Sequence, residues 1–473
     1  MLPAAVAKAV LSGGKRAMRT KTSSGRLPRF VAAIAVLSAL SAPRVASAQG
    51  APGGAARRIN DVVILRGRQV SGMLGARYER IGAFAVKNGR LDPAPFQIDE
   101  RDRDGALIYT TYGGGTTGKR RGALGPADEI LFLYRDAGEK RGGEPLPAGA
   151  VEGAEITVSD PLGGPERRLY LFAFEKTAPR SETDYVTYDP RRDWVTSPYY
   201  VLGFPYRKAI QVPSFFALTE AAGGDGRNIY DLYKLRLTLD LKLLGEATWT
   251  QDDFSCTPVG YVDGPVRVSR RVKSALRLAG PFHSATIDSD SAYYPYHCEF
   301  PSLLQIPFPL SAIARSVTMR ITDDLSPEAK GMTWCNERNR SGIAITGKPG
   351  GEAALDSGPY RWKLAHGPQG TIMTLTIFDP GMAMIGKKLF YSDDEATPDE
   401  PCQFKGQIAN SGYTLTSIES MPKGNYTFTV YVFCPVRYVP GGEQAYLDSV
   451  LHPLAVSVAV VPAAEAGAAS PRP

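Results

Sequence analysis

Hydrophobic and polar residues alternate along much of this chain, which is the pattern of half-buried β-strands. The clearest example, residues 234–243 (KLRLTLDLKL), places five leucines on one side of an extended strand and polar residues on the other. Residues 266–278 (VRVSRRVKSALRL) alternate similarly, except that Arg270 falls on the apolar side. Long segments with helical periodicity are scarce. We therefore predict a mainly β protein of antiparallel strands with few helices.

Seven further runs rich in β-branched and aromatic residues are predicted as strands. They are residues 130–134, 168–174, 316–322, 371–378, 413–418, 426–433 and 455–461. The chain has 49 Gly and 37 Pro residues, and many separate these runs, as turns between antiparallel strands require. This organisation indicates an antiparallel β-sandwich or supersandwich.

The first 48 residues have the features of a cleavable signal peptide. An apolar run at residues 30–40 follows basic residues and precedes Ala46-Ser47-Ala48, so we predict cleavage after Ala48 and export to the periplasm or beyond the cell. The run is shorter than the roughly 20 apolar residues that a membrane-spanning helix needs. The pattern leaves open whether translation starts at Met1 or at Met18.

The remaining chain is divided by its composition. Two segments are rich in Ala, Gly and Pro, with too few apolar groups to offset the entropy of ordering, and a polar, Pro-containing stretch at residues 177–193 marks a domain boundary. We predict a disordered linker (49–58), an N-terminal β domain (59–180), a larger C-terminal β-sandwich domain (181–461) and a disordered tail (462–473).

The charge balance argues against a nucleic-acid partner. Eight of the 55 basic residues, and none of the 48 acidic ones, lie within residues 1–48. Cleavage would therefore leave a chain with almost no net charge, whereas nucleic-acid binding needs a clustered positive field. No other apolar run reaches transmembrane length, so we predict no transmembrane segment in the mature chain.

The five cysteines contain no C-x-x-C pair, which disfavours a zinc ribbon or a thioredoxin-like site. In an oxidising compartment the expected use is disulfide bonding. On sequence proximity we predict Cys256–Cys298 and Cys402–Cys434, with Cys335 unpaired; other connectivities stay open.

One acidic segment has the carboxylate spacing of a calcium loop. Glu100, Asp102 and Asp104 alternate before Gly105, and Ca²⁺ prefers such oxygen ligands. Thr111 stands where an EF-hand would supply its bidentate Glu, so only a looser Ca²⁺ loop is considered, and the alternative is a solvated acidic turn.

The best candidate for a functional site lies at residues 282–300 (FHSATIDSDSAYYPYHCEF). His283, His297 and Tyr294 are candidate catalytic groups, and Tyr293, Tyr294 and Tyr296 are candidate sugar-stacking groups. The alternative for these residues is ordinary packing. The chain lacks H-E-x-x-H, G-x-S-x-G and phosphate-loop motifs, so no complete catalytic motif is found.

A row of basic residues is predicted on one face of the strand at residues 266–278. Arg267, Arg271, Lys273 and Arg277 share this face, which would match carboxylates repeated along an acidic polysaccharide. The alternative is the solvated polar face that many antiparallel sheets have.

Three segments carry a resemblance to known sequences. PAPFQIDE (93–100), DEILFLYRDAG (128–138) and DGPVRVSRR (263–271) resemble segments of exported bacterial proteins of unassigned function. This resemblance implies an envelope or secreted β-rich protein and assigns no catalytic residue. The DGPVR turn is also similar to β-supersandwich proteins that handle sugars.

These observations favour a glycan-binding protein of the cell envelope or secretome. The partner would be a polysaccharide or another envelope component. Two other functions stay open: a glycan-active enzyme of lyase or hydrolase type, and a structural protein that joins an envelope assembly by strand addition.

Overall fold

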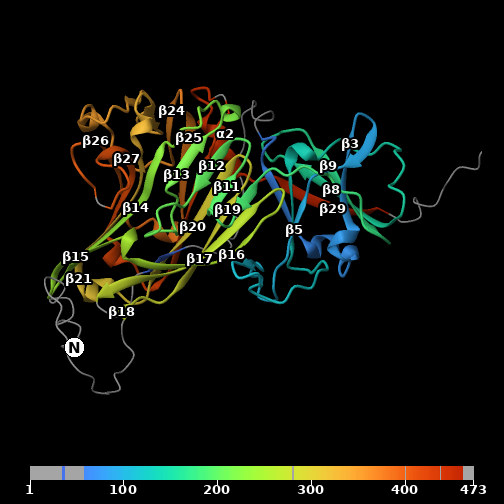
Figure 1. Ribbon diagram of the computed structural model, residues 1–473, viewed down its shortest axis with the longest axis horizontal. Helices are drawn as coiled ribbons and strands as arrows, with labels where there is room; N and C mark the ends of the chain where they lie inside the picture. The colour runs from blue at the N-terminus through green and yellow to red at the C-terminus, as the bar shows by residue number, and fades with distance from the viewer. Residues whose placement is uncertain (1–34, 38–57, 280–281, 400, 437, 462–473) are drawn as a thin grey trace, which may run out of the picture.

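The computed structural model of the chain describes residues 35–37, 58–279, 282–399, 401–436 and 438–461. These residues form two lobes, an N-terminal domain and a larger C-terminal domain, both made mainly of antiparallel strands (Figure 1). The predicted fold class is confirmed. The predicted linker, the predicted tail and all of the predicted signal peptide except residues 35–37 lie outside the described residues, apart from Arg58 at the linker's end.

The N-terminal domain is a sandwich of a three-stranded and a five-stranded sheet. The core between them contains apolar side chains from both, among them Val63, Ile130 and Leu171. In sheet order, the three-stranded sheet consists of β2 (Val62–Arg66), β7 (Glu129–Leu133) and β5 (Gln97–Asp99). The five-stranded sheet consists of β29 (Ala455–Val461), β8 (Ala150–Ser159), β9 (Arg167–Phe174), β3 (Ile81–Lys87) and β4 (Arg90–Pro93).

The end of the described chain returns to this first domain. β29, drawn red in Figure 1, pairs with β8 along its whole length. Residues 455–461, which the sequence analysis assigned to the C-terminal domain, therefore complete the N-terminal sheet. The short strand β6 (Thr110–Thr111) crosses in the other direction and pairs with the C-terminal domain.

The C-terminal domain packs one large sheet against two smaller ones around a common core. The large sheet has 12 strands, and its central order is β25-β28-β20-β19-β17-β16. These strands are β25 (Gly370–Phe378), β28 (Gly424–Phe433), β20 (His297–Ile306), β19 (Ile287–Tyr293), β17 (Val268–Ala279) and β16 (Phe254–Val262). Its other strands are β23 (Ile343–Ala344), β22 (Thr333–Asn336), β24 (Trp362–Gly367), β18 (Phe282–His283), β6 and β1 (Ala35–Leu37).

The two smaller sheets have five and four strands. In sheet order, the five-stranded sheet consists of β15 (Gly245–Thr250), β14 (Tyr230–Leu241), β21 (Ala314–Leu325), β27 (Gln407–Thr416) and β26 (Gly386–Asp394). The four-stranded sheet consists of β10 (Thr187–Asp189), β11 (Trp194–Thr196), β12 (Tyr200–Gly203) and β13 (Phe215–Leu218). No helix among the described residues is long and apolar enough to cross a membrane.

Strand β14 shows how far the alternating pattern predicts burial. Leu237 and Leu239 face the core, as expected, whereas Leu243 is 85% exposed because the strand ends at Leu241. Lys234, on the face expected to be solvated, is buried: its Nζ lies 2.5 Å from Asp324 and donates to a backbone carbonyl in the loop between β26 and β27. The loop covers this face, which the alternation alone could not predict.

The large sheet is open between β19 and β20. These strands pair at only two positions, next to their connecting turn, although β19 pairs with β17 along its whole length. Farther along β20, residues 303–305 pair with β1, which lies within the predicted signal peptide. In the described part of the chain, residues 300–302 therefore have no strand partner on the edge of β20 that faces β19.

All five cysteines are thiols in this structure, which contradicts the predicted disulfides. Cys256 on β16 and Cys298 on β20 are separated by two intervening strands, or roughly 14 Å at 4.8 Å per strand, beyond the ~7 Å limit for a bridge. Cys402 lies in the loop between β26 and β27, whereas Cys434 follows β28 in the large sheet. Proximity in the sequence was therefore a poor guide to which cysteines lie close together in the fold.

Candidate functional site

A buried ionic cluster joins the two domains. Arg267, immediately before β17, donates to Asp99 on β5 at 3.0 Å, and its Nη2 lies 2.6 Å from Glu129 on β7. Arg101 also donates to Glu129 at 2.8 Å. Burial raises the pKa of Glu129, but the charges of the two arginines outweigh burial and lower this pKa to about 2. Arg267, a predicted ligand-binding residue, is therefore buried and engaged within the protein.

The backbone next to Arg267 is also held by the N-terminal domain. The Gln97 side chain accepts hydrogen bonds from the N–H groups of Val266 (3.0 Å) and Arg267 (2.8 Å). A Cβ on Gly264 would lie 2.4 Å from Cδ of Gln97, so a larger residue would displace this hydrogen-bonded side chain. The three segments that carry the sequence resemblance meet at this junction: residues 93–100, 128–138 and 263–271.

A cleft of about 450 Å³ lies between the domains. Its floor is the outer face of β20 and β28, and its walls come from residues 59–64 and from helix α2 (Glu443–Leu451). Aromatic rings and polar groups share the lining. They include Asp61, Tyr294, Tyr296, His297, Glu299, Tyr431, Phe433, Tyr438 and Tyr446.

A groove of about 320 Å³ adjoins the cleft on the same face of the sheet. Glu299 and Tyr431 line both hollows. Because side chains alternate along a strand, every second residue of β17, β19, β20 and β28 reaches this outer face. Those lining the groove include Ser269, Arg271, Asp290, Ala292, Glu299, Pro301, Thr427, Thr429 and Tyr431, and the N-terminal domain adds Arg101, Leu107 and Tyr109.

His297 and Glu299 form a pair that can exchange a proton with a bound molecule. The Nε2 of His297 lies 3.3 Å from Oε1 of Glu299, whose side chain is 31% exposed. The imidazole ring stacks between Tyr294 and Phe433, with centroid distances of 4.6 and 5.2 Å. This stacking fixes the orientation of the ring. The pair can form hydrogen bonds with hydroxyl groups or act in acid–base chemistry.

The predicted basic row on β17 is largely matched by carboxylates on β19. Arg271 donates to both oxygens of Asp290, at 2.5 and 2.7 Å, and Lys273 lies 4.0 Å from Asp288. Arg277 donates to the backbone carbonyls of residues 252 and 253. The geometry therefore gives little support to a row of available cations that would match an acidic polysaccharide.

The structure brings together three of the five predicted His and Tyr candidates. Tyr294, Tyr296 and His297 line the cleft. The Tyr296 ring stacks on Tyr199 with a centroid distance of 4.1 Å, and burial raises the pKa of its phenol. Tyr293 instead points into the core and is fully buried. His283, on β18, lies near the opposite end of β17 from the cleft.

Sequence reasoning missed Glu299, Tyr431, Tyr438 and Tyr446. Glu299 could have been found, because it is two positions after His297 and a strand places residues at this spacing on one face. Tyr431 belongs to the predicted strand at residues 426–433, but the sequence does not reveal that this strand pairs with β20. Tyr438 and Tyr446 carry no recognisable sequence signal.

The candidate calcium loop is a turn closed by hydrogen bonds. Oδ1 of Asp102 accepts from the N–H groups of Asp104 and Ala106, both at 2.9 Å. The buried carboxylate of Glu100 accepts from the N–H of Arg121. Within the described ranges no three His, Cys, Asp or Glu side chains are grouped to hold a metal. This geometry does not support the calcium prediction.

Comparisons with known proteins do not assign a family. No family model and no curated protein matches the sequence. Solved structures with some likeness include an α-mannosidase from Enterococcus faecalis V583 (TM-score 0.42, 9% identity, 85% of this chain and 44% of that chain). A glycosyl hydrolase family 38 protein from Enterococcus faecalis has a TM-score of 0.43 (8% identity, 84% and 45%), and a β-arabinopyranosidase 0.26 (8% identity, 54% and 40%).

This chain spans less than half the length of each of these three proteins. With TM-scores below 0.5, the likenesses carry no argument about its activity.

Proposed function

We propose that this chain is an exported glycan-binding protein whose ligand occupies the cleft and groove between its two domains. The observation that carries the proposal is that Glu299 and Tyr431 line both hollows. A carboxylate and an aromatic ring therefore border both adjoining hollows. The two volumes, about 450 and 320 Å³, are in the range of small-ligand sites, which is roughly 300–1,000 Å³.

The lining suits a sugar because it combines ring faces with groups that donate and accept hydrogen bonds. Tyr431 on the floor and Tyr446 on α2 offer apolar ring surface to sugar C–H groups, while tyrosine hydroxyls bond at the ring edge. Glu299 accepts hydrogen bonds from sugar hydroxyls, and His297 can donate or accept. Such a mixed lining is expected for a ligand with alternating apolar and polar surface.

The charges of the site favour an uncharged glycan over the acidic one that the sequence suggested. Arg271 is engaged by Asp290, and Arg267 by Asp99 and Glu129. A ligand carboxylate would have to compete with these buried or half-buried ion pairs. A neutral sugar has no such cost.

A glycan array tests the proposal. The chain from Gln49 onward should bind at least one neutral glycan, and Glu299→Gln and Tyr431→Ala should each reduce the signal at least tenfold. Tyr426→Ala is the matched control, because Tyr426 lies on β28 with Tyr431 but lines neither hollow. Absence of any bound glycan, or equal signals from all variants, would refute the proposal.

A glycan-active enzyme is the second candidate, favoured by a single observation. Asp290 and Glu299 line the same groove, and glycoside hydrolysis commonly uses two carboxylates that flank the bond. Asp290, however, accepts hydrogen bonds from Arg271 and from Tyr109, the latter at 3.0 Å. If the chain is an enzyme, incubation with the bound glycan should yield new reducing ends that Glu299→Gln abolishes. Binding without turnover would exclude this candidate.

A further inference from the structure

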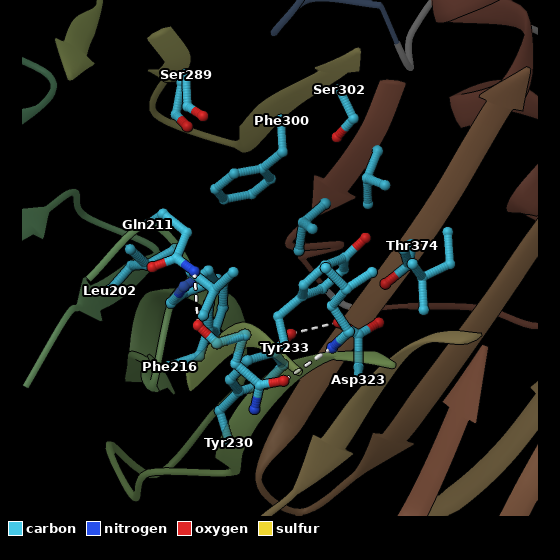
Figure 2. Close-up of a pocket in the computed structure, with 18 of the residues that line it drawn as sticks. Leu202, Gln211, Phe216, Tyr230, Tyr233, Ser289, Phe300, Ser302, Asp323 and Thr374 are labelled. Carbon is cyan, nitrogen blue, oxygen red and sulfur yellow. Dashed lines mark hydrogen bonds between the residues drawn. The ribbon is translucent and has the colours of Figure 1, made fainter. Parts of the chain in front are cut away.

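The C-terminal domain encloses a cavity of about 90 Å³ between its sheets (Figure 2). Ser289, Ser302 and Thr374 present hydroxyl groups from the large sheet, and Phe216 and Tyr233 lie on the other side. Ser289 and Thr374 are each only 8% exposed. Across the described ranges, none of the three hydroxyls has a hydrogen-bond partner within the protein. Because these hydroxyls line the cavity, they can form hydrogen bonds with a molecule that enters it.

This cavity adjoins the groove through the opening between β19 and β20. Ser291 and Ser302 line both spaces. They alternate along their strands with Asp290 and Pro301, which line only the groove. Inward-facing residues can reach the outer groove here because the two strands do not pair at these positions. Figure 2 shows Phe300 projecting into the cavity between Ser289 and Ser302.

The cavity suits an uncharged group. Among the described residues, the ionisable side chains that line it are those of Asp323 and two tyrosines. The Asp323 carboxylate is already paired with Lys363 at 2.7 Å and accepts a hydrogen bond from the Tyr230 hydroxyl. A charged ligand group would therefore enter an apolar space without a counter-ion, which is strongly unfavourable.

We infer that the ligand is a glycan bearing a short acyl ester, with its sugar in the groove and its acyl chain in the cavity. This inference rests on the proposed function. The serine hydroxyls beside the opening can donate to the ester carbonyl, and the aromatic wall buries the alkyl chain. A cavity of about 90 Å³ is smaller than the roughly 150 Å³ cavity that holds benzene, so the chain is short.

The test compares each sugar with its acylated form. Methyl glycosides of glucose, galactose, mannose and N-acetylglucosamine are titrated calorimetrically, with and without a 6-O-butanoyl ester. The ester form of the bound sugar should bind at least tenfold more tightly. Tenfold corresponds to about 1.4 kcal/mol, less than two fully buried methylene groups provide.

Ser302→Leu should abolish this advantage by filling the opening, and Ser289→Leu, on the other side of it, should do the same. Ser316→Leu is the matched control, because Ser316 is exposed on β21 outside the cavity. Melting temperatures show whether each variant is folded. Equal affinity of esters and parent glycosides, or an advantage that survives both cavity variants, would overturn the inference. If no glycoside binds in either form, the proposed function itself fails.

Discussion

Glu129→Gln should weaken the junction between the domains by an amount that depends on pH. The pKa of Glu129 is about 2 in the folded protein, against an ordinary value of 4.5. At about 1.4 kcal/mol per pH unit, this difference stabilises the folded state by about 3 kcal/mol at neutral pH. Removing one partner of a buried ion pair typically costs about 3–5 kcal/mol, which agrees with this value.

The direction of the pH dependence follows from the lowered pKa. Stabilisation by the ionised carboxylate is complete above pH 4.5 and is lost as the pH falls towards 2. The difference in unfolding free energy between wild type and Glu129→Gln should therefore shrink from about 3 kcal/mol at pH 7 to about 1.5 kcal/mol at pH 3.

Urea unfolding followed by far-ultraviolet circular dichroism measures this difference. Circular dichroism is needed because all four tryptophans lie in the C-terminal domain. Glu139→Gln, at an exposed position of the N-terminal domain, serves as the control. A difference below about 1 kcal/mol at pH 7, or one that does not change with pH, would mean that the ionised Glu129 carboxylate does not stabilise the junction.

Three further predictions concern the junction, the thiols and export. Gly264→Ala should lower the unfolding free energy by about 1–3 kcal/mol, because its Cβ would lie 2.4 Å from Cδ of Gln97, and unchanged urea unfolding would contradict this. Thiol titration of unfolded, unreduced protein should find five thiols, and any smaller number would indicate a disulfide. The mass of protein recovered from an envelope fraction should begin at Gln49, whereas a retained N-terminus would contradict cleavage.

The alternating pattern predicted the strands well because a sheet with one buried face imposes a period of two. Where the pattern breaks, long-range contacts are the reason. Arg270 interrupts the alternation of β17 because it points inward and forms a buried ion pair with Asp193, 2.6 Å away and 77 residues earlier in the chain. The pairing of β29 with the N-terminal sheet could not be predicted either, because the sequence of an apolar strand does not specify the strand with which it pairs.

Only part of the candidate site was predicted, because some of its residues are brought together only by long-range strand pairing. His297, Tyr294 and Tyr296 are close in sequence and stay close in the fold. Their neighbour Tyr431 comes from a strand more than 130 residues away, which only the pairing of β20 with β28 brings near. The carboxylates that pair with part of the predicted basic row could not be foreseen either, because only the pairing of β17 with β19 places them opposite it.

Calorimetric titration of the glycan selected on the array tests most directly whether the cleft and groove form the binding site. Wild type, Glu299→Gln and Tyr426→Ala are compared under the same conditions, and circular dichroism confirms that each is folded. If the glycan binds there, Glu299→Gln raises the Kd at least tenfold while Tyr426→Ala leaves it unchanged. An unchanged Kd for Glu299→Gln would contradict binding at this site.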